Sequence, residues 1–235
     1  MQAKIYLIPT TLGDTDRLSS VFPAYNLEII HQLNVFVVEK VRTARRFLKA
    51  VGHPVPIDQM QFFELNKHTD PAEIEHYLKV AEQVTSMGII SEAGAPAVAD
   101  PGAVVVRMAH EKGIKVVPLV GPNSILMALM ASGFNGQQFT FHGYLPVDSA
   151  ERTRKIKQLE QEVYRHNVTQ IFMETPFRNN KMMDSLLRVL QPNTRLCVAA
   201  NITLPGETIV TRTVSQWKKE KADFNKKPAI FLIYK

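Results

Sequence analysis

Two glutamates in this sequence each stand about one helical turn before an arginine: Glu39 before Arg42, and Glu174 before Arg178. A guanidinium beside a carboxylate favours the ionised carboxylate and orients it. Such a carboxylate can accept a proton from a weakly acidic hydroxyl. The same pair can instead lock two loops together without taking part in chemistry. Both roles stay open for Glu39 and for Glu174.

Three arginines, Arg42, Arg45 and Arg46, lie on one predicted helix. Arg42 shares a helix face with the other two, because residues three and four apart are neighbours on a helix surface. This arrangement suits contacts to phosphate groups. A solvated helix face is the alternative interpretation.

The loop over residues 91–102, Ser-Glu-Ala-Gly-Ala-Pro-Ala-Val-Ala-Asp-Pro-Gly, follows a short apolar run. Small residues let the backbone approach a ligand closely, and prolines stiffen the loop. Ligands bind to open α/β sheets at the carboxyl ends of their strands. The loop is therefore predicted to be a backbone cradle for a small molecule, although a plain strand-to-helix connection has a similar composition.

The 235 residues suffice for one large domain or two smaller ones, and 45% hydrophobic with 21% charged residues is an ordinary globular composition. The net charge of +6 is unevenly placed, since residues 1–120 carry −1 and residues 121–235 carry +7. Basic residues gather at 152–157 and 218–227. This asymmetry favours a polyanionic partner such as RNA, and a solvated surface is the alternative.

Several classes of site are not expected. The single cysteine, Cys197, excludes an intramolecular disulfide and stands inside an apolar strand. Asp70 and Glu73 fit the capping of a helix that begins at Pro71, so they need no metal partner beside His68, and we expect no metal site. There is no G-x-G-x-x-G or P-loop motif. A secretory signal and a membrane-length apolar run are also missing, which predicts a cytoplasmic protein.

The elements that would position these residues alternate between strand and helix, which predicts an α/β fold. We expect strands at 5–8, 35–38, 88–91, 114–119, 139–144, 170–174, 196–200 and 230–234. Helices are expected at 27–33, 41–51, 71–83, 103–112, 125–131, 150–163 and 179–190. Pro122 is a plausible hinge, so the prediction is an N-terminal α/β domain (1–120), a C-terminal α/β domain (121–235) and a cleft between them.

Six segments, in order along the chain, resemble one family. Residues 8–14 (I-P-T-T-L-G-D) are similar to V-P-T-P-I-G-N, residues 38–48 to A-E-D-T-R-H-T-R-R-L-L, and residues 91–102 to S-D-A-G-T-P-x-I-S-D-P-G. Residues 117–124 resemble V-P-L-P-G-P-S-A, residues 141–152 resemble F-x-G-F-L-P with a following E-R, and residues 172–178 resemble F-Y-E-S-P-H-R. These motifs are those of the tetrapyrrole methylase superfamily, and within it of the ribosomal RNA small-subunit 2′-O-ribose methyltransferase I group.

The resemblance implies a homodimeric methyltransferase with a mainly parallel sheet in its N-terminal domain and a mixed sheet in its C-terminal domain. It also implies that S-adenosylmethionine (SAM) binds folded in the cleft between the domains. By motif, the cofactor would touch Thr10, Thr11, Leu12, Ala93, Gly94, Ala95, Pro96, Val98, Pro122, Asn123, Ser124, Met173, Ala199, Ala200, Pro228 and Ala229. The substrate would meet Arg42, Arg45, Arg46 and Arg178, with Glu174 or Glu39 as the catalytic carboxylate.

The departures from the motifs lie on the substrate side. The group's A-R-E-L-T-K, with a downstream E, stands here as residues 199–204, A-A-N-I-T-L, followed by Glu207. Lys40 replaces the aspartate of E-D-T-R, and Phe177 replaces the histidine of E-S-P-H-R. We also expect no counterpart of the group's additional C-terminal domain. Cofactor binding is thus better supported than the identity of the substrate.

The function predicted from these residues is SAM-dependent methylation of ribosomal RNA at a ribose hydroxyl. Methylation of a tetrapyrrole or another small molecule is an alternative, and a steep salt dependence of RNA binding would separate the two. A non-catalytic, SAM-binding protein associated with the ribosome is the third possibility, because charged residues near position 200 are lost. Trp217 would either stack a base or pack into the core.

Overall fold

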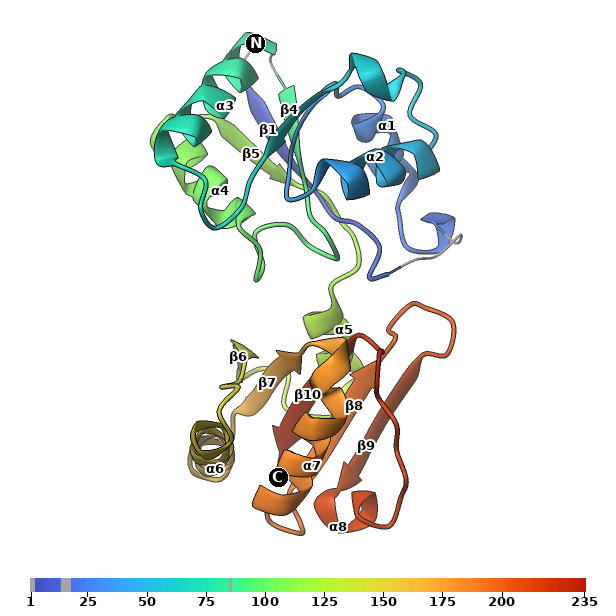
Figure 1. Cartoon of the computed structure of the whole chain (residues 1–235), viewed down its shortest axis with the longest axis vertical. Coiled ribbons are helices and arrows are strands. Elements are labelled where there is room, and N and C mark those ends of the chain that lie inside the picture. The colour runs from blue at the N-terminus through green and yellow to red at the C-terminus, as the bar shows by residue number, and fades with distance from the viewer. Residues whose placement is uncertain (1–2, 14–17, 85) are drawn as a thin grey trace. The chain divides into compact units, whose positions relative to one another are not determined.

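The structure is a computed structural model that describes residues 3–13, 18–84 and 86–235, with Ser19 described in its backbone only. The chain divides into two compact units, Met1–Asn123 and Ser124–Lys235 (Figure 1). Each unit is one sheet with helices packed on it.

The first unit is built on a five-stranded sheet in the order β3-β2-β4-β1-β5. All neighbouring strands in it are parallel. Their bounds are β1 (Lys4–Ile8), β2 (Val35–Val38), β3 (Gln61–Glu64), β4 (Ser86–Ile90) and β5 (Lys115–Pro118). Parallel strands end at the same edge of a sheet, so the loops that follow β1, β2 and β4 gather at one edge.

Helices cover both faces of this sheet. Val35 and Val37 of β2 belong to the core with α3 (Pro71–Val84) and α4 (Gly102–Glu111). Phe36 and Val38 belong to the other core, with α1 (Ala24–Ile30) and α2 (Val41–Ala50). Because successive strand residues point to opposite faces, a central strand with both faces covered must be apolar throughout, as β2 is. Figure 1 shows the two pairs of helices on either side of the sheet.

Asp70 caps α3 as predicted: its Oδ1 accepts a hydrogen bond from the backbone N of Ala72 at 2.8 Å. This contact accounts for Asp70 without a metal ion. Across residues 3–13, 18–84 and 86–235, no group of three or more His, Cys, Asp or Glu side chains is arranged so that it could hold a metal ion.

The second unit has a mixed sheet in the order β6-β7-β10-β8-β9. The β6 and β7 strands are parallel, whereas β10 is antiparallel to both β7 and β8, and β8 is antiparallel to β9. The bounds are β6 (Phe139–Tyr144), β7 (Thr169–Glu174), β8 (Arg195–Ala200), β9 (Thr208–Thr213) and β10 (Ala229–Tyr234). The predicted fold class, with a parallel sheet first and a mixed sheet second, is confirmed.

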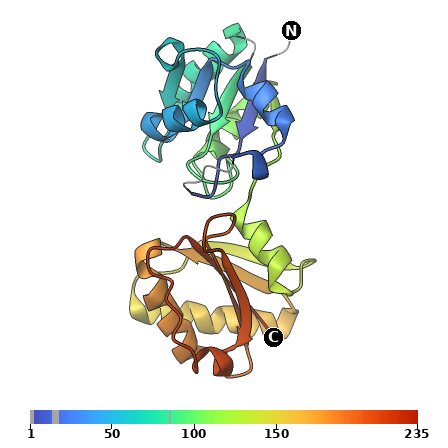
Figure 2. The same cartoon turned by 90° about the vertical axis from the view of Figure 1, so that its right-hand side faces the viewer.

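The helices of this unit also cover both faces of the sheet. Side chains of α6 (Ser149–His166), α7 (Asn179–Val189) and α8 (Val214–Trp217) form one large core with Phe172 and Phe231 of the sheet. The α5 helix (Ser124–Ser132) packs against β8, β9 and β10. Figure 2 shows α5 and α7 on opposite sides of these strands.

Three buried side chains in this unit decide between predicted alternatives. Trp217 is 2% exposed and its Nε1 donates to the Leu196 carbonyl at 2.8 Å, so it packs into the core and stacks no base. Cys197 is fully buried, as its place in an apolar strand predicted. Arg152 is also buried: its Nε donates to Ser185 Oγ at 3.1 Å and its Nη1 to the Val147 carbonyl at 2.8 Å. Counting Arg152 within a surface basic cluster was therefore wrong.

The sequence prediction missed β3, β9 and α8. The β3 strand is short and lies at an edge with polar residues at both ends, so its apolar signal is only two residues long. The β9 strand lies at the other unit's edge and is half-buried, and α8 is a single turn. Short 3₁₀ turns occur at Leu18–Ser20, Ile57–Gln59 and Pro176–Arg178, the last called η3 below. In the described part of the chain, no helix is both long enough and apolar enough to span a bilayer.

Candidate active site

Two loops at the edge of the first unit's sheet are joined by a small backbone bridge. The backbone N of Thr10, after β1, donates to the Gly94 carbonyl at 3.0 Å, and the Gly94 N donates to the Thr10 carbonyl at 3.2 Å. Thr10 Oγ1 also donates to the Ser91 carbonyl at 3.2 Å. The cradle loop, residues 91–102 after β4, is thus held against the loop that follows β1.

Gly94 is the point at which three segments converge. Its φ is +72°, a region that L-residues rarely adopt. A Cβ added there would lie 3.1 Å from Leu12 Cδ2 and 3.3 Å from the Pro122 carbonyl oxygen. The structure therefore brings together residues of the first loop, the cradle and the hinge, three segments predicted to touch one cofactor. Asp14, which closes the first motif, lies outside the described residues.

Asp100 fixes the far half of the cradle loop. Its Oδ1 accepts hydrogen bonds from the backbone N of Ala97 at 3.1 Å and of Gly102 at 2.7 Å. Ala97 and Ala99 have φ of 64° and 54°, which is unfavourable for residues with a Cβ and persists only where other contacts hold it. Val98, between them, is 46% exposed. The carboxylate of Asp100 thus keeps the backbone of the cradle in one conformation.

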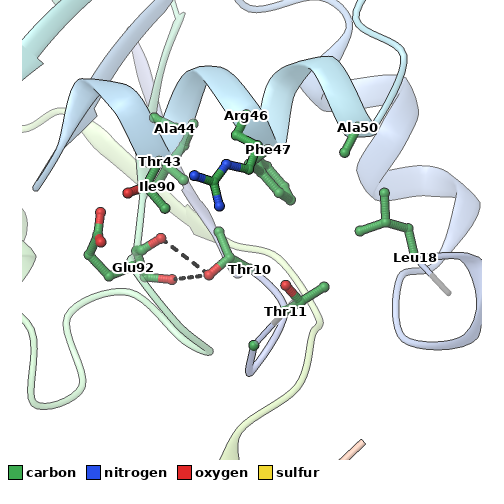
Figure 3. A pocket seen from close by; sticks show the side chains of 12 residues that line it. Thr10, Thr11, Leu18, Thr43, Ala44, Arg46, Phe47, Ala50, Ile90 and Glu92 are labelled. Atoms are coloured by element: carbon green, nitrogen blue, oxygen red, sulfur yellow. Dashed lines mark hydrogen bonds between the residues drawn. The ribbon is translucent and has the colours of Figure 1, made fainter. Parts of the chain in front are cut away.

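A pocket of about 300 Å³ opens beside the Thr10–Gly94 bridge. Apolar side chains such as Leu18, Phe47 and Ile90 line it together with three threonine hydroxyls, one guanidinium and one carboxylate. Its lining residues are Thr10, Thr11, Gly13, Leu18, Thr43, Ala44, Arg46, Phe47, Ala50, Ile90, Ser91 and Glu92. Figure 3 shows the guanidinium of Arg46 pointing from α2 into this pocket, above Thr10. Such a lining suits a ligand with a flat apolar part and polar or anionic substituents.

The three arginines predicted to face a substrate differ in their surroundings. All three are exposed on α2, and Arg46 lines the pocket. Arg45 instead lies over the ring of Phe62, with its Cζ 5.5 Å from the ring centroid. The structure therefore brings one of the three, Arg46, into the pocket.

Carboxylates gather at the ends of β2 and β4. Burial raises the pKa of Glu39, the charges of Glu92 and Asp100 raise it further, and Lys40 lowers it. Lys40 Nζ lies 3.6 Å from Glu92 Oε2. Among the described ion pairs there is none between Glu39 and Arg42, so the expectation that Arg42 holds Glu39 ionised was wrong. Lys40 is the cation that acts on this cluster.

Glu174 and Arg178 form the second predicted pair, and here the structure does join them. Glu174 Oε1 accepts from Arg178 Nε at 3.0 Å, from Arg178 Nη2 at 2.6 Å and from the backbone N of Thr175 at 2.6 Å. The Glu174 side chain is 3% exposed. Three donors on one buried oxygen make this pair a lock between the end of β7 and the η3 turn.

The remaining residues predicted to contact the cofactor are spread over two units. Ala93, Ala95 and Pro96 lie in the cradle loop, while Asn123 ends the first unit and Ser124 begins α5. In the second unit, Ala199 and Ala200 are fully buried strand residues paired on both sides. Met173 is half-buried, Ala229 is buried at the start of β10, and Pro228, just before this strand, is exposed.

The loop after β8, where the sequence departs from the resembling motif, is strained. Asn201 and Thr203 have φ of 53° and 66°. The backbone N of Thr203 donates to Glu207 Oε2 at 2.7 Å, while Thr203 Oγ1 is buried without a hydrogen-bond partner. The two residues that match the motif, Thr203 and Glu207, are thus joined by a hydrogen bond within this loop.

Four residues of this region had no predicted role: Lys40, Thr43, Glu92 and Asp100. Thr43 and Glu92 line the pocket, and Asp100 holds the cradle. A usable signal existed for Asp100, because aspartate side chains in turns commonly accept a hydrogen bond from the backbone N two residues on, as Asp100 does from Gly102. Lys40 and Glu92 come from separate loops, so their pairing required the sheet order.

Comparisons with known proteins cover nearly the whole chain. A profile of the tetrapyrrole (corrin/porphyrin) methylases matches residues 4–217. "Ribosomal RNA small subunit methyltransferase I" of Escherichia coli O157:H7 is 27% identical over 235 residues, covering 99% of this chain and 78% of that protein. The protein of the same name from Haemophilus influenzae is 28% identical over 232 residues, covering 97% and 77%.

A solved structure supports the fold. The crystal structure of the methyltransferase CobJ superimposes with a TM-score of 0.62 at 15% identity, covering 98% of this chain and 92% of that one. At this identity the likeness concerns the fold alone. Together with the family profile and the order of the six motifs, it confirms the predicted resemblance. The chain belongs to the tetrapyrrole (corrin/porphyrin) methylases, a family of SAM-dependent methyltransferases.

Proposed function

We propose that this protein binds SAM at the cradle loop and transfers its methyl group to a ribose hydroxyl of ribosomal RNA. The observation that carries the proposal is the convergence of Leu12, Gly94 and Pro122 beside a pocket that Arg46 lines. The names of the relatives in E. coli and H. influenzae support ribosomal RNA as the substrate. The charge of +7 over residues 121–235 supports a polyanionic substrate as well.

The cradle fits an extended small molecule that lies against backbone. Gly94 lets the cradle backbone lie close to Leu12 and Pro122, and the stretch from Ala93 to Val98 offers backbone groups on a loop that Asp100 holds. We assign cofactor binding to Thr10, Thr11, Leu12 and this stretch, together with Pro122, Asn123 and Ser124. When bound, SAM supplies an electrophilic methyl group on a positively charged sulfur. The predicted contacts of Met173, Ala199, Ala200, Pro228 and Ala229 stay predictions.

The pocket beside the cradle would hold the acceptor. Arg46 would bind a phosphate next to the acceptor ribose, since a guanidinium can donate two hydrogen bonds to it. Thr10 and Thr43 would lie along the sugar. Most of the rate gain in such a transfer comes from holding the acceptor oxygen in line with the methyl group.

A ribose hydroxyl also needs a group that takes its proton. Glu92 lines the pocket and its charge acts on Glu39, whose raised pKa suits a proton acceptor. We assign this role to the Glu39–Glu92 pair. Glu174 is a positioning residue, because its Oε1 already accepts three hydrogen bonds within its own loop.

We further propose that the protein is a homodimer. The α5 helix exposes Leu126 (48%) and Met130 (82%), which share a helix face at a spacing of four. A helix that is apolar on every side is usually covered, and a second copy would cover this face. A ribosomal substrate would place the protein in the cytoplasm.

Two measurements test the proposed function. Calorimetric titration should give saturable binding of SAM and of its demethylated product. Transfer of a labelled methyl group from SAM to small ribosomal subunits, and to RNA extracted from them, should then mark ribose. Binding without transfer to either would favour a non-catalytic protein. Transfer to a tetrapyrrole but not to RNA would exclude the RNA substrate, and absence of SAM binding would exclude the enzyme.

A further inference from the structure

Phe177 is the most exposed of the described phenylalanine, tyrosine and tryptophan side chains, at 76%. It lies on the η3 turn, Pro176–Arg178, between β7 and α7. A large apolar ring is less favourable in water than buried against other apolar groups. The fold of the second unit makes no use of this ring, since it belongs to neither the core nor its partly buried rim.

Contacts from three sides fix the η3 turn that carries Phe177. Arg178, the next residue, is bound through Nε and Nη2 to the buried Glu174. On the other side, the backbone N of Lys226 donates to the Pro176 carbonyl at 2.9 Å. Beneath the turn, the buried Asn179 donates from Nδ2 to the carbonyls of Phe224 at 3.2 Å and of Lys227 at 2.6 Å. A rigid mount lowers the entropy that a ligand must overcome when it packs on the ring.

The surroundings of the ring are cationic. Lys226 is exposed and sits in a left-handed conformation with φ of 60°. The side chain of Arg178 is 36% exposed, and its pair with Glu174 leaves Nη1 outside the bidentate contact. Of the nearby carboxylates, Glu174 is paired with Arg178, while Asp223, which accepts from Asn180 Nδ2 at 2.8 Å and from Asn225 N at 3.0 Å, offsets only one of the two charges of Lys226 and Lys227. The local balance therefore favours a ligand that combines a flat ring with negative charge.

We propose that Phe177 stacks one unpaired base of a single-stranded RNA segment, with Lys226 at the adjoining phosphate. This inference rests on the proposed RNA substrate and adds a second contact to it, on the second unit. An aromatic side chain stacks any base, because every base presents a π face, and a neighbouring cation follows the backbone. The contact would position a loop of the RNA without reading its sequence.

Binding of RNA can be measured directly, without cofactor or turnover. We would follow the fluorescence anisotropy of a labelled oligoadenylate decanucleotide, with the full chain, over a series of KCl concentrations. An abasic ribose-phosphate decamer of the same length serves as the second probe. The variants are Phe177→Ala, Phe177→Trp and Lys226→Gln. Tyr25→Ala is the control, because Tyr25 is a 57% exposed aromatic on α1 of the other unit.

Replacing a stacking aromatic side chain by alanine typically costs roughly 1–3 kcal/mol of binding free energy per base. Phe177→Ala should therefore weaken oligoadenylate binding roughly fivefold to a hundredfold. Its salt dependence should match that of the wild type, because stacking releases no counterions. Lys226→Gln should lower the salt slope by roughly 0.7, the value for one phosphate contact on a single strand. Phe177→Trp should bind as tightly as the wild type or more tightly. The abasic probe should not distinguish Phe177→Ala from the wild type.

Three results would overturn the inference. Equal binding of oligoadenylate by the wild type and Phe177→Ala would remove the stacking contact while leaving RNA as the substrate. Loss of a dimer on light scattering in Phe177→Ala would assign the ring to a protein contact. No binding of either probe by the wild type at low salt would overturn both this inference and the proposed RNA substrate.

Discussion

Lys40 Nζ lies 3.6 Å from Glu92 Oε2, where β2 and β4 end side by side. The resembling motif has an aspartate at the position of Lys40, so a cation stands here in place of an acid. With 66% of the Lys40 side chain exposed, the pair is worth no more than about 1 kcal/mol of stability. Its larger effect is on the charge of the neighbouring carboxylates, which share this edge.

Glu39 should make stability depend on pH. Burial, then the charge of Glu92, raises its pKa in the folded chain. A carboxyl with a raised folded-state pKa favours folding while protonated, and this contribution is lost as pH rises through that pKa. Glu39→Gln should therefore raise the Tm above the folded-state pKa of Glu39, and the difference should vanish at acidic pH.

Lys40→Gln supplies the matched test, since Lys40 lowers the pKa of Glu39. In this variant the folded-state pKa of Glu39 rises further, so the loss of stability with increasing pH should be larger and should continue to a higher pH than in the wild type. Thermal denaturation at low salt, from acidic to slightly basic pH, measures both variants. Curves of Tm against pH that run parallel to the wild type would rule out this role for Glu39.

Gly94 and Gly113 form a matched pair for testing the cradle. Both have left-handed backbones, with φ of +72° and +70°. Alanine at either position should cost about 1 kcal/mol of stability, because the conformation disfavours a Cβ. A Cβ at Gly94 meets Leu12 and Pro122, whereas one at Gly113 meets nothing within 4 Å. Gly94→Ala should thus weaken SAM binding in calorimetry, and Gly113→Ala should leave it unchanged. Equal affinities of the two variants would place the cofactor elsewhere.

The sequence predicted most of the fold because its central strands are continuous apolar runs. Val35–Val38 is buried on both faces, and such a run between turn residues predicts a parallel strand. Strand β3 was missed because Gln61 and Glu64 bound it and its two phenylalanines are only half-buried. At an edge, pairing with β2 decides the strand, and that information is not local.

Features carried by one segment of the candidate site could be predicted from the sequence, whereas contacts between two segments could not. The small residues of the loop 91–102 indicated a cradle without any knowledge of Thr10. The separate surroundings of Arg45 and Arg46 could not be predicted, because Arg45 lies over Phe62, a residue of another element, strand β3. The partner of Glu39 was misjudged for the same reason. Sequence spacing suggested Arg42, while the sheet order supplies Glu92 and Lys40.

Glu174 and Arg178 should behave as a structural lock. Arg178→Ala leaves the buried Glu174 carboxylate without its cation, which should cost about 3 kcal/mol of unfolding free energy. Glu174→Gln keeps an oxygen acceptor for Thr175 N and Arg178, so it should cost less. Urea denaturation measures both. If Glu174 only positions the η3 turn, Glu174→Gln should retain methyl transfer within a few-fold. Loss of transfer in a variant with unchanged stability would instead make Glu174 the catalytic carboxylate.

Arg46 should be the arginine on α2 that methyl transfer needs. It lines the pocket with Thr10 and Thr43, whereas Arg45 lies over Phe62. A hydrogen bond to a charged group is worth roughly 1.5–3 kcal/mol, so Arg46→Ala should reduce transfer to RNA roughly tenfold to a hundredfold. Arg45→Ala should act mainly on stability, by about 0.5–1 kcal/mol through the lost cation–π contact.

Lys49→Ala is the control for charge alone, because Lys49 is exposed in the last turn of the same helix. The rate of transfer at saturating SAM, measured over a range of RNA concentrations, separates binding from chemistry. We expect Arg46→Ala to raise the KM for RNA while calorimetry finds SAM affinity unchanged, since Arg46 lines the pocket that we propose for the acceptor. A fall in SAM affinity instead would assign the pocket to the cofactor. Equal losses of transfer rate in Arg46→Ala and Lys49→Ala would show that only the general attraction between positive charge and RNA is affected.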